Sequence, residues 1–590
     1  KELQHHKMMI VVEYALFGVL MALNLGLGLY FSLPGKGRSG NTPVEMFLGN
    51  RALRALPLAA SVVASLISST GLVGLTGHLY AYGFHFTWVC LSLAAAAPIA
   101  SWLFLPVLYE LRVTSVFEYL RLRFNSVISI TTCVIYVLLT QSIGALTIYA
   151  ASLTIVTVFG APLMWCNIGI GLCGTLYTAL GGLRAVVWTD CMQLVFILIG
   201  PATIIAKIIF DWNSPGASPQ PLSDIDLRAY FANLKFDITH DENVWSVVSS
   251  ITVALYRVGM DQVVVQRCMA SRTLASARRT TYIGALLLNV FNLVLLAMAF
   301  ALVLWFRGCD PLLAGAVRSY DQILPFYIKT YLVTFPGFTG LFLAAVVTAA
   351  TSTISWAINT MAAVVYVDIL SLRIKCLNIG HVTRGLAFLL GIVMTLYSCI
   401  CLYLGSVVGA IIMVSAATTG PCVGLLLLAV AFPFVHSKGA GISTLLMFGL
   451  QLCLMWLRIR DGLRSPHMPL SLEYCHENTS YLQRFPNVTS LNSSKRVQHD
   501  GGFVHFSPFW NCLFSTCGTV VLGVVISLAT GELKKPRASV KHLSRPLVGL
   551  WRRLGVMEAK ETDQEDVRLD QLAAATLLWK DGDSNPRAIA

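Results

Sequence analysis

A group of side-chain oxygen atoms lies in the middle of a strongly apolar stretch of this chain. The segment TAATSTISWAINT, residues 348–360, has five hydroxyl residues among its first eight and no charged residue. On a helix, Ala349, Ser352 and Thr353 have i, i+3, i+4 spacing and share a face. Hydroxyls together with carbonyls of an unwound neighbouring helix would suit Na⁺, a small hard cation. The alternative is that the hydroxyls bond back to carbonyls of their own helix.

Two other apolar stretches, residues 55–83 and 244–264, are interrupted by glycine and polar residues. Glycine loosens a helix, so that backbone groups and nearby hydroxyls become available to a solute. Interrupted spans at corresponding places in two halves of a chain are a strong sequence indication of a transporter binding site. The candidate solute-binding residues are Thr70, Gly71, Arg257 and Gly259. The alternative is a pair of flexible packing helices.

Arg257 places a positive charge in the middle of an apolar stretch. Such a charge costs at least a few kcal/mol and indicates a functional site. Arginine binds a carboxylate with two parallel hydrogen bonds, which suits a small organic anion. The alternative is an i, i+4 ion pair with Asp261, and the sequence leaves both interpretations open.

The elements that must position these residues are membrane helices. The chain has 590 residues, of which 56% are hydrophobic and 12% charged, and its mean hydropathy is +0.71; soluble proteins carry about 25% charged residues. Apolar runs of roughly 20 residues cross a bilayer as helices. The thirteen predicted spans are 9–33, 55–83, 86–109, 128–158, 162–181, 185–210, 244–264, 281–306, 338–366, 381–404, 406–435, 440–457 and 509–529. The first is expected to be a retained helix and not a signal peptide.

The loops predict the orientation of the chain in a plasma membrane. Lys and Arg crowd the first, third and seventh connections, which the positive-inside rule makes cytoplasmic. The N-terminus is then extracellular and the C-terminus cytoplasmic. The loop 458–508 falls outside by this count, and its three glycosylation sequons agree with that placement. These sequons are at Asn478, Asn487 and Asn492, and an oxidising exterior also permits a disulfide between Cys309 and Cys475.

Several function classes are excluded by what the sequence lacks. It has no phosphate loop, no H-E-x-x-H zinc motif and no G-x-S-x-G elbow. The dinucleotide-like GIGLCG at 169–174 lies in a predicted span, where small residues serve close helix packing. The net charge of +13 is explained by loops that face the cytoplasm and need no nucleic acid. We expect no enzyme activity, no cofactor, no metal other than sodium, and no protein partner that the sequence identifies.

Three motifs resemble one transporter family. The segments LYTALGGLRAVVWTD at 176–190, GMDQVVVQR at 259–267 and CDP at 309–311 resemble motifs of the sodium/solute symporter family, as does the hydroxyl-rich helix. Within that family the chain is most similar to the branch of sodium-coupled monocarboxylate, sodium-dependent multivitamin and iodide transporters. The resemblance covers nearly all of the membrane part.

The resemblance implies an all-α polytopic membrane protein of the LeuT type, built from two inverted five-helix repeats. Its expected divisions are residues 1–54, with the first helix and a cytoplasmic loop; 55–435, the ten-helix core with repeats 55–210 and 244–435; 436–529, two accessory helices with the loop 458–508; and 530–590, a cytoplasmic tail. The tail is polar and charged and is expected to lack a packed core of its own.

The resemblance also implies site residues. The main sodium site of the family matches Ala64, Ile67, Ala349, Ser352 and Thr353. A second sodium site of some members matches Asp190 and Ser355, but Trp356 stands where those members have a hydroxyl. Asp190 is therefore also a candidate to pair with a basic residue such as Arg184.

The predicted function is sodium-coupled import of a small organic anion, a monocarboxylate or carboxylated vitamin, by alternating access. Sugar carriers of the family have Glu and Gln where this chain has Thr70 and Gly71, and iodide carriers differ at Gly71 and Ala254. The alternatives are a sodium-binding sensor or uncoupled channel on the same fold, and a symporter of another small solute such as an inorganic anion.

Overall fold

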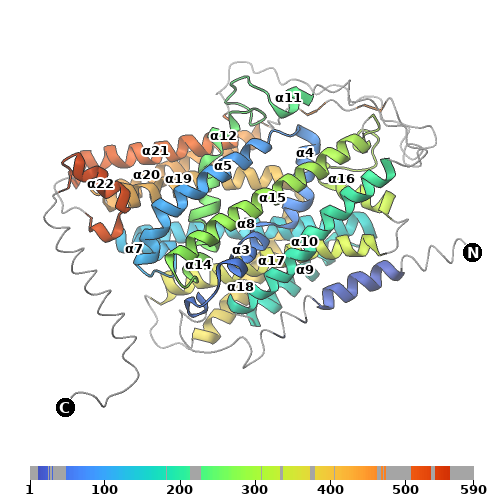
Figure 1. Cartoon of the computed structure of the whole chain (residues 1–590), viewed down its shortest axis with the longest axis horizontal. Helices are drawn as coiled ribbons and strands as arrows, with labels where there is room; N and C mark the ends of the chain where they lie inside the picture. Colours follow the sequence, from blue (N-terminus) through green and yellow to red (C-terminus); the bar gives the residue numbers. More distant parts are fainter. Residues whose placement is uncertain are drawn as a thin grey trace, which may run out of the picture.

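The computed structural model of the chain is helical throughout the part that it describes (Figure 1). It describes residues 11–23, 26, 30, 48–180, 183–212, 227–306, 308–332, 337–371, 379–403, 406–461, 467–468, 471–472, 506–532 and 538–557. Within these described residues, β-type pairing is limited to one isolated bridge, between Leu53 and Ser271. The all-α prediction is confirmed.

Long apolar helices lie side by side in the bundle. They are α5 (Thr87–Ile99), continued by η3 (Ala100–Phe104) and α6 (Leu105–Glu110); α8 (Ser126–Phe159); α9 (Leu163–Leu180); α10 (Leu183–Trp212); α15 (Leu274–Phe306); α17 (Phe338–Val364), continued by η8 (Val365–Leu370); α18 (Ile379–Ile400); α19 (Val407–Ala431); α20 (Ser437–Arg460); and α21 (Pro508–Ala529). Among the described helices, nine are long and apolar enough to cross a membrane, and a bent pair makes a tenth. The N-terminal helix Val11–Leu23 and the part Leu163–Leu176 of α9 are apolar but shorter than these ten, and they match two more predicted spans.

Two spans are broken. The first consists of α3 (Ala55–Leu66), then η2 (Thr70–Leu75) and α4 (Thr76–Tyr82), with a bend of 62°. The break lies at Ile67, whose backbone is extended (φ −88°, ψ 112°), before the glycines that were expected to loosen this helix. The second consists of α12 (Ser246–Ser249), α13 (Ile251–Leu255), η5 (Tyr256–Met260) and α14 (Gln262–Met269), and it breaks at Asp261 (ψ 129°).

The helix α17 runs through the centre of the bundle, where it packs against α3, α8, α9 and α10. In its most apolar window 94% of the residues are buried, against 28–61% for the other long spans. A helix that is apolar on all sides is typical of such a central position. Any hydroxyl on α17 must therefore face another protein segment and not lipid.

A connection between α15 and α17 covers the α4 end of the bundle, on the right in Figure 1. It contains η6 (Tyr320–Gln322), α16 (Ile323–Tyr327) and η7 (Ile328–Leu332). A side chain at Gly77 would overlap the backbone carbonyl of Tyr320, so the two backbones are in contact. The Tyr80 hydroxyl also donates a hydrogen bond to Asp310 (2.6 Å). The short helix α11 (Leu227–Phe231) lies at the same end.

The opposite end of the bundle, on the left in Figure 1, carries α7 (Val116–Arg123), η12 (Val540–His542) and α22 (Arg545–Arg553). Arg123 of α7 donates hydrogen bonds to three carbonyls at the end of α19, those of Ala429, Phe432 and Val435. Residues 538–557 pack against the same region. The tail was expected to lack a packed core of its own, and in this segment the apolar side chains pack against the end of the bundle instead.

Candidate functional site

The hydroxyls of α17 face the last turn of α3. Ser352 Oγ lies 3.0 Å from the carbonyl oxygen of Ala64, and Thr353 Oγ1 lies 3.5 Å from that of Ser65. Each hydroxyl also lies close to the carbonyl of Ala349 on its own helix, at 2.9 and 3.1 Å. The structure therefore brings hydroxyl and carbonyl oxygens of two helices into one buried cluster.

The end of α3 gives this cluster its negative character. Because α3 ends at Leu66, its last carbonyls lack the partners that a continuing helix would provide. They also form the negative end of the helix dipole. Ala64, Ser352 and Thr353 are at most 1% exposed, and Ile67 is 2% exposed. Oxygen atoms gathered in so dry a place favour a bound cation.

Asp190, predicted for a second sodium site, instead forms an ion pair with Arg267 of α14. The Arg267 Nη2 to Asp190 Oδ2 distance is 3.1 Å, and the two side chains are 1% and 0% exposed. Ser61 and Ser65 of α3 donate to the same carboxylate oxygen, at 2.5 and 3.3 Å. The sequence had suggested a basic partner such as Arg184, whose side chain lies outside the described part of the structure. Arg267 was overlooked although it closes the quoted motif GMDQVVVQR, because sequence alone does not show that α14 reaches α10.

Ser355, the other predicted member of the second site, is fully buried on α17. Its Oγ and the Oδ1 of Asp190 both lack a hydrogen-bond partner within the described residues. The hydrogen bonds of Asp190 go to α3 and α14, and none of those described goes to Ser355. The structure thus does not join the two residues, and a second sodium site stays a prediction.

Arg257 reaches the same helix end from the other broken span. Its Nη2 donates a hydrogen bond to the carbonyl of Leu66 (2.8 Å), and the residue is exposed. No ion pair joins it to Asp261. That carboxylate caps α14, accepting from the backbone N–H of Val263 (3.1 Å) and from the hydroxyl of Tyr136 (3.4 Å). The i, i+4 pair considered from the sequence is therefore not formed, because the chain is extended at Asp261.

The remaining solute candidates differ in their surroundings. Thr70 exchanges a hydrogen bond with the hydroxyl of Ser68. A Cβ added to Gly71 would meet no atom within 4 Å, so this residue borders open space. A Cβ added to Gly259 would overlap Ala100. Gly259 thus serves close packing of η5 on η3, whereas Gly71 leaves room beside the break.

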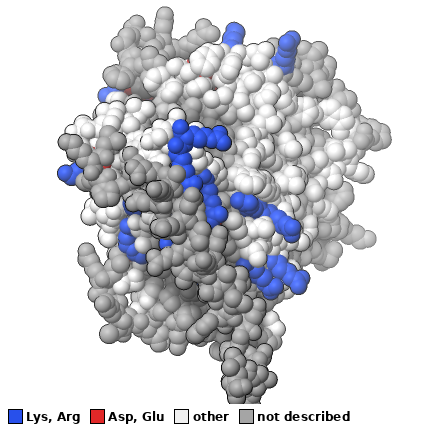
Figure 2. Space-filling model, turned by 60° about the vertical axis from the view of Figure 1, so that its left-hand side comes forward, with Lys and Arg blue, Asp and Glu red and all other residues white. Residues whose placement is uncertain are grey.

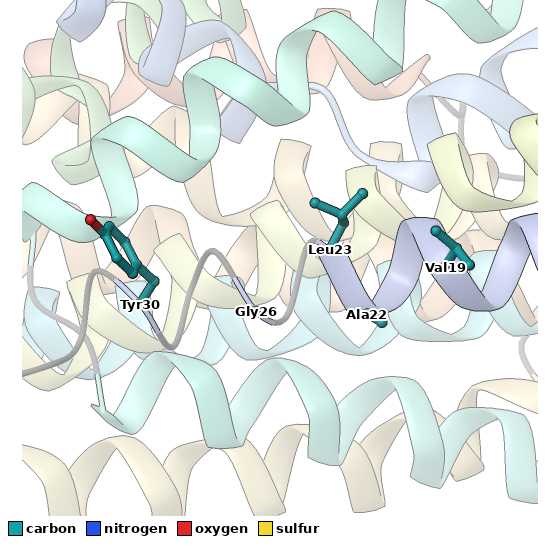
Figure 3. Close-up of a pocket in the computed structure, with 5 residues that line it drawn as sticks. All are labelled: Val19, Ala22, Leu23, Gly26 and Tyr30. Carbon is teal, nitrogen blue, oxygen red and sulfur yellow. The ribbon is translucent and has the colours of Figure 1, made fainter.

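A shallow depression of about 590 Å³ lies elsewhere, along the N-terminal helix (Figure 3). It is lined by Val19, Ala22, Leu23, Gly26 and Tyr30. Val19 and Leu23 are 57% and 53% exposed on the outside of the bundle. Apolar, exposed side chains in this position are typical of a surface that contacts lipid, and they offer nothing to an ion or a charged solute.

Two further predictions concern residues at the periphery. Cys309 is disulfide-bonded. Its predicted partner, Cys475, lies outside the described residues, although the backbone N–H of the adjacent Asp310 donates to the carbonyl of Ser471 (3.2 Å). The pairing therefore stays a prediction. The glycosylation candidates Asn478, Asn487 and Asn492 also lie outside the described residues.

Sequence comparison with known families agrees with this geometry. The model of the sodium:solute symporter family matches residues 46–446. The chain belongs to this family. It is 29% identical to mouse (Mus musculus) sodium-coupled monocarboxylate transporter 2, over 97% of this chain and 92% of that protein. It is 30% identical to the human (Homo sapiens) sodium/iodide cotransporter, over 89% of this chain and 84% of that protein.

Among solved structures, a Na⁺-coupled sialic acid symporter in a substrate-bound outward-open state has a similar fold. The TM-score is 0.71 with 20% sequence identity, over 90% of this chain and 99% of that chain. The present chain is therefore a multi-pass membrane protein of the LeuT-like fold, and it couples solute movement to Na⁺. It is a transporter and not an enzyme, and Na⁺ is its coupling ion, as the sequence predicted.

Proposed function

We propose that the protein imports a small organic anion, a monocarboxylate or a carboxylated vitamin, together with Na⁺ across the plasma membrane. The observation that carries the proposal is the guanidinium of Arg257, exposed at the break of α3 and free of any ion pair with Asp261. Several relatives of the family are named as monocarboxylate transporters, which supports the same class of substrate.

In this proposal Na⁺ binds where α3 meets α17, held by the carbonyls of Ala64, Ile67 and Ala349 and the hydroxyls of Ser352 and Thr353. A bound cation would replace the present hydrogen bonds between the two helices and hold the broken span against its central neighbour. Inward movement of each charge gains about 2.3 kcal/mol per 100 mV of membrane potential. That gain, added to the sodium gradient, drives the uptake.

The anion binds beside the cation. Arg257 uses one nitrogen for the carbonyl of Leu66, two residues after Ala64. Its remaining N–H groups can donate to a carboxylate in the open space next to Gly71. Anion and cation would then share one helix end and stabilise each other, because opposite charges attract strongly where water is scarce. Such mutual stabilisation is what couples the two solutes.

The sodium assignment is tested by removing both hydroxyls, with Ser352→Ala and Thr353→Ala together. Sodium-driven uptake into proteoliposomes should be lost while the purified protein remains folded. Thr351→Val is the matched control, because this hydroxyl donates to the carbonyl of Thr348 in its own helix (3.1 Å). Sodium activation that is unchanged in the double variant would refute the site.

The anion assignment is tested at Arg257. Arg257→Gln should raise the KM for the anion roughly 10- to 150-fold, since a hydrogen bond to a charged group contributes about 1.5–3 kcal/mol. Asp261→Asn should leave KM unchanged, because asparagine caps a helix as well as aspartate does. An unchanged KM in Arg257→Gln would exclude the contact. A sodium-binding sensor or an uncoupled channel would bind Na⁺ but would show no concentrative uptake of the anion, in the wild type as well as in the Arg257→Gln variant.

The proposed orientation has an extracellular N-terminus, an extracellular loop 458–508 and a cytoplasmic C-terminus. The contact of Glu13 with Gly337 supports part of this arrangement, since it puts the first residues of the N-terminal helix and of α17 at the same end of the bundle. Peptide-N-glycosidase should increase the gel mobility of the protein made in glycosylating cells. Replacing Asn478, Asn487 and Asn492 by Gln should abolish that shift, and wild-type protein without a shift would remove the support for this loop's placement.

A further inference from the structure

The segment 538–557, which we call the strap, is attached to the end of α19. The indole of Trp551 donates a hydrogen bond to a carbonyl there, and its ring lies 5.6 Å from that of Phe434 and 5.9 Å from that of Phe432. Three hydrogen bonds join the two segments: Trp551 Nε1 to Ala431 O (2.5 Å), Ser544 N to Val430 O (3.1 Å) and Ala538 N to Pro433 O (3.0 Å).

The strap also contacts α6 and α7. The hydroxyl of Tyr119 donates to the carbonyl of His542 (2.9 Å), and Arg545 forms an ion pair with Glu110 (3.2 Å). Because α19 and α6–α7 are distant in sequence, the strap bridges two separate parts of the bundle end. Its position therefore affects how these parts lie against each other.

One face of α22 is left uncovered by the bundle. Val548 is 4% exposed and Trp551 is docked, whereas Leu550 and Leu554 are 48% and 61% exposed. The two leucines have i, i+4 spacing and therefore lie on one side of the helix. An exposed apolar pair on a docked helix is typical of an element that lies in a membrane interface.

The strap is also basic. The strap carries Lys541, Arg545, Arg552 and Arg553 and has no acidic residue between positions 538 and 557. Lys541, Arg545 and Arg553 are exposed. Lys and Arg side chains are spread over this side of the molecule, whereas few acidic side chains are visible there (Figure 2). Such a surface attracts anions.

The strap lies at the depth where membrane spans end. Its docking partner Ala431 is the last residue of α19, and α20 begins six residues later at Ser437. Tryptophan at such a position is typical of the membrane–water interface. In a membrane, the uncovered leucines and the basic side chains would therefore be at the level of the lipid headgroups.

We propose that the strap binds anionic phospholipid headgroups of the adjoining leaflet, with Leu550 and Leu554 in the acyl boundary. Each basic residue near an anionic membrane surface strengthens attachment roughly fivefold. Lipid binding fixes the strap across α7 and α19, so the lipid composition of that leaflet controls how firmly the bundle end is held.

The experiment uses the full chain in nanodiscs of phosphatidylcholine, with or without 30% phosphatidylserine, and measures hydrogen exchange across residues 538–557. We expect exchange to slow by a factor of five or more with phosphatidylserine. Lys541→Gln with Arg553→Gln should remove this protection while keeping the Trp551 contact. Lys235→Gln with Arg318→Gln is the matched control, because both residues are exposed and lie in connections remote from the strap; it should behave as wild type.

Equal exchange in the two lipid mixtures would overturn the proposal, and so would full protection in the Lys541 and Arg553 variant. Inorganic phosphate added to phosphatidylcholine nanodiscs distinguishes a free anion from a lipid surface. Protection by phosphate alone equal to that by phosphatidylserine would also overturn it. The readout needs no transport, so failure here is independent of the proposed substrate.

Discussion

The buried ion pair between Asp190 and Arg267 allows a quantitative test of the structure. Both side chains are at most 1% exposed, and Ser61 and Ser65 bond to each of them. Arg267→Gln removes the positive charge and leaves the carboxylate buried with only the serines. Breaking such a pair costs about 3–5 kcal/mol, so the free energy of unfolding should fall by that amount. Asp190→Asn should have a similar effect, because it leaves the arginine unpaired.

The double variant Arg267→Gln with Asp190→Asn carries no unpaired charge in this place. It should recover most of the loss, which gives a coupling energy of about 3 kcal/mol in a double-mutant cycle. Arg460 and Asp461 provide the control, since their side chains are 56% and 28% exposed and such an exposed pair should show little coupling.

The free energies can be measured by unfolding the purified protein with sodium dodecyl sulfate in mixed micelles. Losses that simply add in the double variant would refute the buried pair. The ion pair should also affect Na⁺ binding, because Ser65 contacts both sites. Its hydroxyl hydrogen-bonds to the ion pair, and its carbonyl oxygen lies next to the hydroxyl of Thr353. Arg267→Gln protein that still folds should need more Na⁺ for half-maximal uptake.

Three further outcomes are expected. Gly77→Ala should impair transport strongly, because the added Cβ would overlap the backbone of Tyr320 at the covered end of the bundle. Gly71→Ala is the control and should fold normally, because the added Cβ would meet no atom within 4 Å. Normal uptake by Gly77→Ala would contradict the backbone contact. Burial raises the pKa of Asp241 to about 7, with help from Glu242. The folded state then holds this proton more tightly than the unfolded state, so stability should rise as pH falls from about 7 toward 4. The thermal midpoint should show this rise relative to Asp241→Asn, and equal pH profiles would exclude it. Peptide mapping without reduction should find Cys309 joined to Cys475, and a bond from Cys309 to any other cysteine would disprove the pairing.

Local spacing and hydropathy predicted the helical architecture and the shared face of Ala349, Ser352 and Thr353. That Ala64 lies against Ser352 and Thr353 was expected only from the resemblance to the symporter family. Sequence reasoning did not predict the partner of Asp190. That pairing depends on how α10, α14 and α3 pack, and no local pattern contains this information. Arg257 and Asp261 show the same limit. Their i, i+4 spacing favours a pair only on a continuous helix, and the break at Asp261 gives each residue a different partner.

The tail shows a different limit. It carries many charged residues of both signs and no apolar run long enough to cross a membrane, so its sequence does not indicate a packed core. Val548 and Trp551 nevertheless find a core, which other parts of the chain provide. Composition measures what a segment can bury by itself, and it cannot show which surface lies within reach.

Glu13 has a consequence for how the protein is made. Its carboxylate lies buried in the N-terminal helix and accepts hydrogen bonds from the backbone N–H groups of Gly337 (2.7 Å) and Gly340 at the start of α17. The first of these partners, Gly337, follows 324 residues later. At about 5–20 residues per second, the ribosome needs roughly 16–65 s to reach it. For that time the first helix holds an acidic group without the backbone N–H donors that later bind it, so the insertion machinery must shelter the carboxylate. Glu13→Gln, which carries no charge, should depend less on this shelter during biogenesis.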